Sequence, residues 1–218
     1  MKKRLFIFLI IGLIGSVLNY AGDDKKSISS EEALKMLIEG NARFVSGASI
    51  NPNQSSKDIE RLSKGQHPLA IILGCSDSRI PPEVVFDQGL GDLFVIRTAG
   101  EVIDSIEIGS IEYAAEHLHV SLIVVLGHGK CGAVTAAHSD GEVEGYLNKI
   151  VNDIRKNISS VNREENNSLE KAIDVNTKSI AHQLKESKPV ISELVEHGKV
   201  KVIPAYYDIA TGKVEFYK

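Results

Sequence analysis

Four largely apolar runs constrain the fold of this chain more than any other feature. They lie at residues 68–74 (PLAIILG), 93–97 (LFVIR), 121–127 (SLIVVLG) and 200–206 (VKVIPAY). Runs without regular alternation of apolar and polar residues are typical of strands covered on both faces, as in a parallel sheet. We therefore expect four buried, mainly parallel strands at these positions.

Helical segments separate the predicted strands, at residues 104–118, 131–137, 147–158, 169–185 and 189–197. Two more helices are expected earlier, one capped by Ser30 and one near residues 59–63. Residues 207–217 predict a turn and a final antiparallel edge strand. Strands that alternate with helices indicate an α/β fold, and 218 residues with 43% hydrophobic content suit one domain over residues 22–218.

The first 21 residues have the layout of a secretory signal peptide. Lys2, Lys3 and Arg4 precede an apolar run at residues 5–18, and small residues follow it before a polar stretch. The run is shorter than the ~20 residues of a membrane-spanning helix. We expect cleavage after Ala21, export to the periplasm and no stable membrane span after processing, with an uncleaved anchor as the alternative. The net charge of -4, without a basic patch, argues against a nucleic-acid partner.

Residue types that commonly bind metals directly follow two of the predicted strands. Cys75-Ser76-Asp77-Ser78-Arg79 follows the first run, and His128-Gly129-Lys130-Cys131-Gly132 follows the third. Ligands of open α/β sheets bind beyond the carboxyl ends of the strands, so these two loops are expected to converge. Two thiolates and an imidazole are a zinc-type ligand set, and three protein ligands leave a fourth place for water. Asp77 would fill that place or stand beside it, held ionised and oriented by Arg79.

Other interpretations of the same residues exist. Two cysteines in an exported chain often form a disulfide, a buried cysteine is often an apolar filler, and a lone histidine is often structural. The glycine-rich residues 127–132 also suggest a phosphate loop, but they lack the full G-x-x-x-x-G-K-[ST] spacing.

The combination of Cys75-x-Asp77-x-Arg79 with His128-x-x-Cys131, together with residues 91–97 (GDLFVIR), resembles the β-class carbonic anhydrases over roughly residues 31–217. The resemblance implies one Zn²⁺ per subunit on Cys75, His128 and Cys131. It makes Asp77 and Arg79 a catalytic pair, in which Asp77 matches an aspartate that binds the metal in an inactive state of some members.

The plant-like branch of this family also implies a substrate pocket. Gln66 would donate a hydrogen bond to the substrate oxygen, and Phe94 and Tyr113 would form an apolar wall for CO2 across a subunit interface. Without the resemblance, plainer roles are favoured: Gln66 as a solvated residue before the strand, Phe94 as a core residue and Tyr113 as part of helix packing. Ala99 is smaller than the usual aliphatic residue of this pocket, and the absence of Trp argues against the bicarbonate-regulated branch.

The resemblance thus implies reversible hydration of CO2 to bicarbonate and a proton by attack of zinc-bound hydroxide. It also implies a homodimer or homotetramer in which the N-terminal helices pack on a partner subunit. The alternatives are a CS2 or COS hydrolase on the same scaffold, a non-catalytic exported zinc-binding protein, and a disulfide-stabilised binding module.

Overall fold

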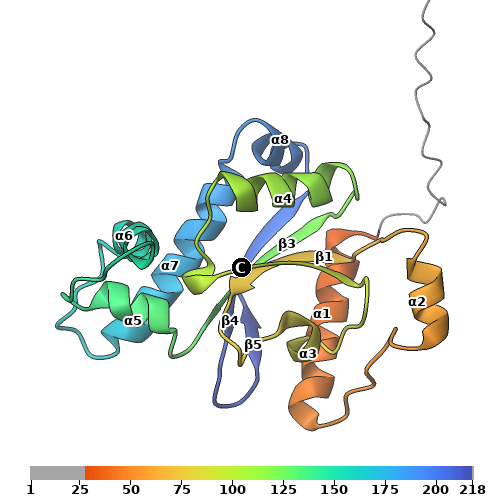
Figure 1. The fold of residues 1–218 in the computed structure, drawn as a ribbon, viewed down its shortest axis with the longest axis horizontal. Helices are drawn as coiled ribbons and strands as arrows, with labels where there is room; N and C mark the ends of the chain where they lie inside the picture. Colours follow the sequence, from red (N-terminus) through yellow and green to blue (C-terminus); the bar gives the residue numbers. More distant parts are fainter. Residues whose placement is uncertain (1–27, 218) are drawn as a thin grey trace, which may run out of the picture.

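A five-stranded sheet forms the centre of the computed structural model, which describes residues 28–217 (Figure 1). The strands are β1 (Ala70–Cys75), β2 (Leu93–Thr98), β3 (Leu122–His128), β4 (Lys201–Tyr207) and β5 (Val214–Phe216), in the spatial order β2-β1-β3-β4-β5. The first four strands are parallel to their neighbours, and β5 pairs with β4 antiparallel. The predicted sheet is confirmed.

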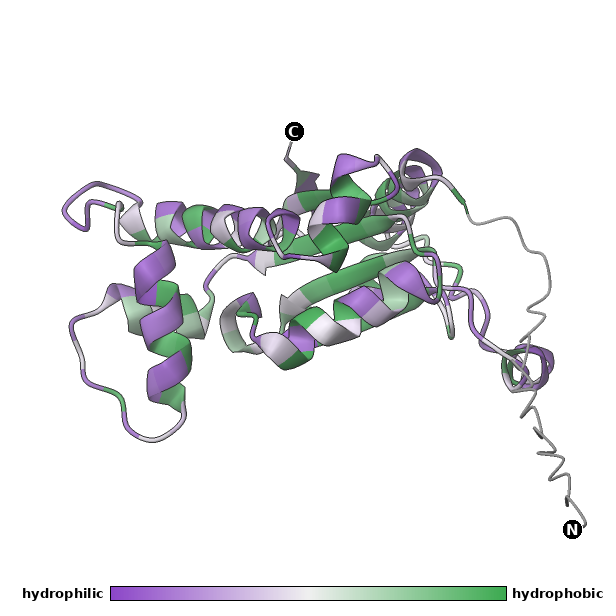
Figure 2. Ribbon diagram, turned by 90° about the horizontal axis from the view of Figure 1, so that it is seen from above, coloured by the Kyte–Doolittle hydropathy of each residue, from purple (hydrophilic) through white to green (hydrophobic). Residues whose placement is uncertain are grey.

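The two central strands explain why their sequences lack alternation. Every residue of β1 and of β3 is buried. Ile72 and Val124 belong to one apolar cluster, whereas their neighbours Ile71 and Ile123 belong to another. Successive side chains of a strand point to opposite faces, so both faces of the sheet are covered. Figure 2 shows the hydrophobic strands enclosed between helices whose outer surfaces are hydrophilic.

Most helices form where the sequence predicts them. They are α1 (Ser30–Ser46), α2 (Ser56–Leu62), α3 (Pro82–Val85), α4 (Ser105–Glu116), α5 (Gly132–His138), α6 (Leu147–Asn157), α7 (Ser168–Lys185) and α8 (Val190–Glu196), with a 3₁₀ turn η1 (Ala99–Glu101). Only the short α3 and η1 were not predicted from the sequence. Within residues 28–217, no helix has the length and apolar character needed to cross a membrane. The predicted signal peptide and its cleavage site lie outside the described residues.

Capping decides where several helices begin. The side chain of Ser29, not that of Ser30, accepts a hydrogen bond from the Glu32 N–H at 3.2 Å, so the predicted cap of α1 was one residue late. Cys131 has extended backbone angles and precedes α5 as its N-cap. Its thiol therefore lies at the junction between the β3 loop and a helix.

Helix α1 is fastened to the domain by polar contacts. Asn41 is buried, and its amide donates to the carbonyls of Val85 at 3.0 Å and Gly212 at 2.9 Å, while its Oδ1 accepts from the Val214 N–H at 2.9 Å. One helix residue thus ties α1 to α3 and to the last hairpin. The following helix, α2, buries none of its residues within this chain.

Candidate metal centre

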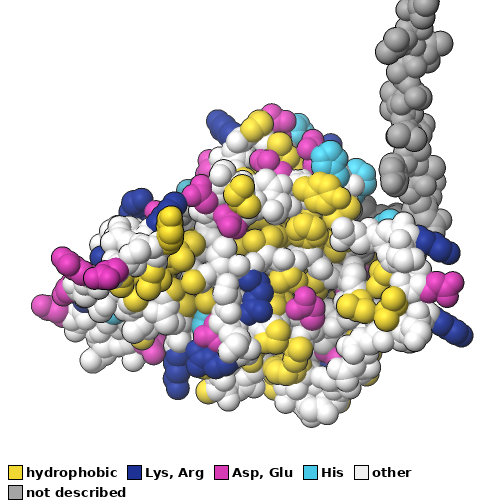
Figure 3. All heavy atoms as spheres, in the orientation of Figure 1, with side chains coloured by type: hydrophobic (Ala, Val, Ile, Leu, Met, Phe, Trp, Pro, Cys, Tyr) yellow, Lys and Arg dark blue, Asp and Glu magenta, His cyan; other side chains and the backbone are white. Residues whose placement is uncertain are grey.

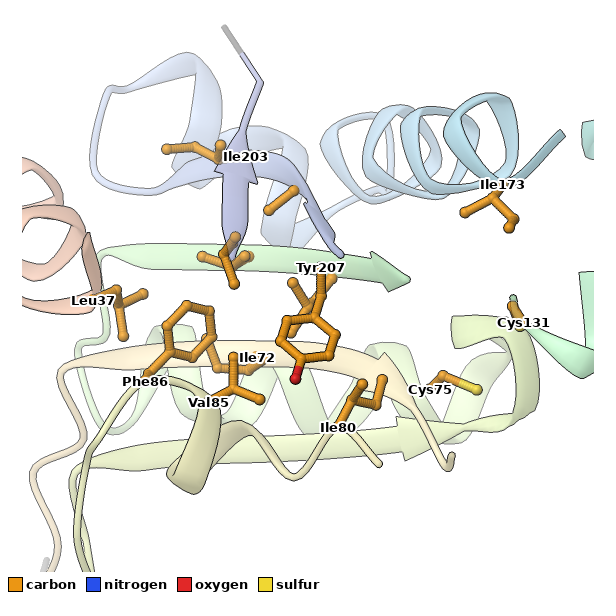
Figure 4. Packing of buried hydrophobic residues seen from close by; sticks show 14 of the residues in the cluster. Leu37, Ile72, Cys75, Ile80, Val85, Phe86, Cys131, Ile173, Ile203 and Tyr207 are labelled. Carbon is orange, nitrogen blue, oxygen red and sulfur yellow. The ribbon is translucent and has the colours of Figure 1, made fainter. Parts of the chain in front are cut away.

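Cys75, His128 and Cys131 meet at the carboxyl end of the sheet. Cys75 is the last residue of β1, His128 is the last residue of β3, and Cys131 caps α5. Their ligand atoms all lie within 4.8 Å of one another, and all three residues are buried. Figure 4 shows Cys75 and Cys131 at one side of the apolar cluster to which they belong, with Cys75 near the end of β1. The predicted convergence of the two loops is present in the structure.

The imidazole of His128 presents a free nitrogen to this cluster. Its Nδ1 lies 2.9 Å from the carbonyl oxygen of Gly129, to which it donates, and its buried Nε2 has no hydrogen-bond partner among residues 28–217. A histidine that binds a metal through one nitrogen usually donates a hydrogen bond from the other. An acceptor nitrogen without a partner, beside two thiols, fits a metal ligand better than a structural histidine.

Both cysteines are free, so the interpretation as a disulfide is not supported. The neighbouring Cys131 thiol, and after it the His128 ring, lower the pKa of Cys75, whose sulfur accepts a hydrogen bond from the Gly100 N–H at 3.3 Å. The Cys131 pKa is raised because its proton is shared with Cys75 and because the thiol is buried. The thiolate is the form of cysteine that binds metals, and one sulfur of the pair already favours that form.

Asp77 and Arg79 form a bidentate ion pair next to the cluster. Arg79 Nε donates to Asp77 Oδ1 at 2.9 Å, Arg79 Nη2 donates to Oδ2 at 2.7 Å, and the Arg79 N–H donates to Oδ1 at 3.0 Å. These hydrogen bonds hold the pKa of Asp77 well below its ordinary value. Arg79 also donates to the carbonyl of Lys130 at 3.3 Å and so connects the two ligand loops. Asp77 is not among the residues whose ligand atoms meet in the cluster.

Two residues at the site were missed by the sequence analysis. Arg97, at the end of β2, donates to the carbonyl of Cys75 at 2.9 Å and to that of Asp77, which fixes the loop between them. Glu101, in η1, is fully buried, and burial first and the Cys75 charge second raise its pKa to about 7. The available signal was a charged residue placed at, or just after, the carboxyl end of an apolar strand.

The predicted pocket residues lie at the other end of the strands. In the pairing of β1 with β2, Phe94 lies opposite Ile71, whereas Thr98 lies opposite Cys75. Phe94 is therefore four residues, or about 13 Å along the strand, from the level of Cys75. Exposed Gln66 precedes β1 by four residues. The rings of Phe94 and Tyr113 lie 6.3 Å apart, centroid to centroid. One chain thus brings Phe94 and Tyr113 together, but it brings none of the three residues to the metal cluster.

Known proteins share this architecture. A sequence profile of the carbonic anhydrase family matches residues 70–214, which include both ligand loops. Carbonic anhydrase 2 of Mycobacterium tuberculosis is 41% identical over 185 residues, which cover 83% of this chain and 89% of that protein. The carbonic anhydrase of Mycolicibacterium smegmatis is 40% identical over 187 residues, covering 84% and 91%.

A solved structure identifies the class. A tetrameric β-carbonic anhydrase from Sordaria macrospora superimposes with a TM-score of 0.66 at 27% identity, covering 85% of this chain and 95% of that chain. The chain belongs to the β-carbonic anhydrase family. Membership confirms the predicted family, fold and enzyme class, and the Cys75, His128 and Cys131 cluster is a site that could bind a metal in such an enzyme.

Proposed function

We propose that this chain catalyses the reversible hydration of CO2 to bicarbonate and a proton, with one Zn²⁺ held by Cys75, His128 and Cys131. The observation that carries the proposal is the buried Cys-His-Cys cluster beside the Asp77–Arg79 pair, in a chain of the carbonic anhydrase family. Two thiolates and one imidazole form a typical zinc site, and three protein ligands leave one place open. When bound, zinc lowers the pKa of a coordinated water and supplies a nucleophile near neutral pH.

Asp77 has the protonation state and the orientation of a proton acceptor. Its low pKa keeps the carboxylate ionised at neutral pH, and Arg79 holds both oxygens in one plane. Each carboxylate oxygen offers two acceptor positions, so Asp77 retains capacity to accept from a water or from bicarbonate. The alternative role, in which Asp77 becomes a fourth metal ligand and closes the site, requires Arg79 to release it.

We propose that a second copy of the chain completes the substrate pocket. Within residues 28–217, β2 pairs with β1 on one side and with no strand on the other, and all six of its residues are only partly buried. Hydrophobic side chains also gather over the face that carries α4 and α3 (Figure 3), where Ile106 is 76% exposed and Val84 is 54% exposed. A partner on this face would carry Gln66, Phe94 and Tyr113, as donor and apolar wall, towards a metal cluster they do not reach in one chain. The proposed assembly is a homodimer or homotetramer, as the resemblance to the plant-like branch implies.

We also propose that residues 1–21 direct export to the periplasm, as their charge and apolar pattern suggest. The mature N-terminus, sequenced from protein isolated from the periplasmic fraction, tests this proposal. A mature chain that still begins at Met1 would exclude cleavage.

Stopped-flow CO2 hydration with a parallel zinc measurement tests the function. The wild-type chain is expected to bind one zinc per subunit and to hydrate CO2, and Cys131→Ala is expected to lose both properties. Full activity of Cys131→Ala would refute the proposed site, whereas zinc binding without hydration would indicate a non-catalytic zinc protein. The same assay with CS2 and COS separates the hydrolase alternative.

A further inference from the structure

Glu101 is a buried acid whose position the proposed chemistry does not explain. Its side chain is fully buried in η1, which follows β2 at the same edge of the sheet as Cys75. Its backbone adopts a left-handed conformation with φ of 46°. Such a conformation is uncommon for a residue other than glycine, and a buried carboxyl is unfavourable unless it is hydrogen-bonded. The surroundings must therefore hold Glu101 in place.

Helix α7 supplies the partners of one carboxyl oxygen. Oε1 of Glu101 accepts hydrogen bonds from the Asn176 amide at 3.2 Å and from the Thr177 hydroxyl at 3.1 Å, and both partners are buried. The other oxygen, Oε2, is buried without a partner. Among the described residues, only three buried side-chain nitrogen or oxygen atoms lack a partner, and two of them are Glu101 Oε2 and His128 Nε2.

Two contacts connect this acid to the metal cluster. The Asn176 amide also donates to the carbonyl of Gly100 at 3.1 Å, and the Gly100 N–H donates to Cys75 Sγ at 3.3 Å. Asn176 thus holds both the carboxyl of Glu101 and the carbonyl of Gly100, the residue whose own N–H reaches the cysteine ligand. The contacts of Glu101 therefore help to fix the direction of the Gly100 N–H.

The second contact is with the strand that carries His128. A Cβ atom placed on Gly127 would lie 1.9 Å from Thr177 Oγ1 and 3.3 Å from Glu101 Oε1. The Glu101–Thr177 pair therefore packs directly against the backbone that precedes His128. The ends of β1 and β3, which carry Cys75 and His128, are thus both linked to the buried Glu101 side chain and its partners on α7.

We propose that Glu101 is a positioning residue of the metal centre, which fixes the Gly100 N–H on the Cys75 sulfur and the strand end that bears His128. The inference rests on the proposed zinc site and deepens it. Outer partners of metal ligands orient those ligands, and losing one typically lowers metal affinity 10–100-fold. Glutamine has the size of glutamate and keeps an oxygen acceptor for Asn176 and Thr177, so it should replace Glu101 far better than alanine.

The test is Zn²⁺ affinity, measured on metal-stripped full-length protein by competition with a chromogenic chelator. Glu101→Ala is expected to weaken zinc binding at least tenfold, and Glu101→Gln to remain within about threefold of wild type. With Co²⁺ in place of Zn²⁺, the thiolate-to-cobalt absorption of Glu101→Ala should shift, because the Cys75 sulfur loses its fixed donor. Thr177→Val, which removes the hydroxyl but keeps the shape of the side chain, should weaken zinc binding several-fold. It provides the test if Glu101→Ala does not fold.

Asn41→Ala is the matched control, because Asn41 is also a buried polar residue with three hydrogen bonds, but it ties α1 to the last hairpin. It should lower stability and leave zinc affinity within twofold of wild type. Zinc affinity unchanged in both Glu101→Ala and Thr177→Val would overturn the positioning role while leaving the proposed function intact. An equal loss in Asn41→Ala would also overturn it, because the effect would then be one of general stability. A wild-type chain without zinc affinity would instead reject the proposed function.

Discussion

Replacement of Gly127 by alanine tests whether close packing behind His128 holds the metal site. The new Cβ would lie 1.9 Å from Thr177 Oγ1, whereas ordinary contacts begin at 3.4 Å, a shortfall of 3.4 − 1.9 = 1.5 Å. Movement of the strand end away from α7 is an overpacking response, which typically costs about 1–3 kcal/mol. Rotation of the Thr177 side chain would instead remove its contacts with Glu101 Oε1 at 3.1 Å and with the Ile173 carbonyl at 2.9 Å, each worth about 1 kcal/mol.

The expected loss in the free energy of unfolding is therefore about 1–4 kcal/mol, depending on the response. Rotation alone does not relieve the crowding, because Thr177 Cβ would still lie only 3.1 Å from the new methyl group. Zinc content should fall as well, since the displaced backbone carries His128. Urea unfolding followed by far-ultraviolet circular dichroism measures the first effect, and this probe suits a chain without Trp. Zinc analysis of the purified protein measures the second.

Gly74→Ala is the matched control for this experiment. Gly74 also lies at the end of a buried strand immediately before a metal ligand, but a Cβ there would meet only Leu126 atoms at 3.8 and 3.9 Å. Alanine should therefore be neutral or stabilise the protein by about 0.5–1 kcal/mol, because it removes the flexibility of a glycine within a strand. Equal stability and zinc content in the two variants would refute the packing argument.

Three further predictions follow from the described contacts. Arg79→Ala should raise the pKa of Asp77 towards its ordinary value, because the hydrogen bonds that lower it are lost; a carboxyl NMR titration that shows no rise would contradict this. Burial raises the pKa of Asp87, but hydrogen bonds from Arg43 and from two backbone N–H groups lower this pKa overall. Wild type should therefore have a larger free energy of unfolding than Asp87→Asn above the unfolded-state pKa of Asp87, and this difference should decline as the pH falls through the lower folded-state pKa. Urea unfolding at a series of acidic pH values measures the difference, and a difference independent of pH would argue against the prediction. Ile106→Glu should give a smaller species in analytical ultracentrifugation, with zinc retained and CO2 hydration reduced; an unchanged assembly would exclude this residue from the interface.

The predicted elements came from patterns that short stretches of sequence contain. The runs at residues 68–74 and 121–127 correspond to strands that are buried on both faces, so their apolar character needs no knowledge of distant residues. The short α3 was missed because a four-residue helix offers too few positions for a periodic pattern. Its place depends on contacts such as the one between Asn41 and Val85, which are 44 residues apart.

The candidate metal ligands were predictable for a topological reason. Parallel strands end at one edge of a sheet, so residues at the ends of two neighbouring strands lie near each other, as Cys75 and His128 do. The residues that support them are not constrained in this way. Glu101 and Thr177 are separated by 76 residues, and their hydrogen bond depends on how α7 crosses the sheet.

The sequence by itself thus determined the main strands and helices, the candidate ligand set and the acid–arginine pair, because each depends on a pattern within short stretches of the chain. The tertiary structure alone decided which sulfur receives the Gly100 N–H, that His128 Nε2 has no partner within residues 28–217, and that Phe94 lies at the end of β2 opposite to the cluster of its own chain. These features depend on distances between segments that the chain brings together only on folding. A local sequence pattern does not contain such distances.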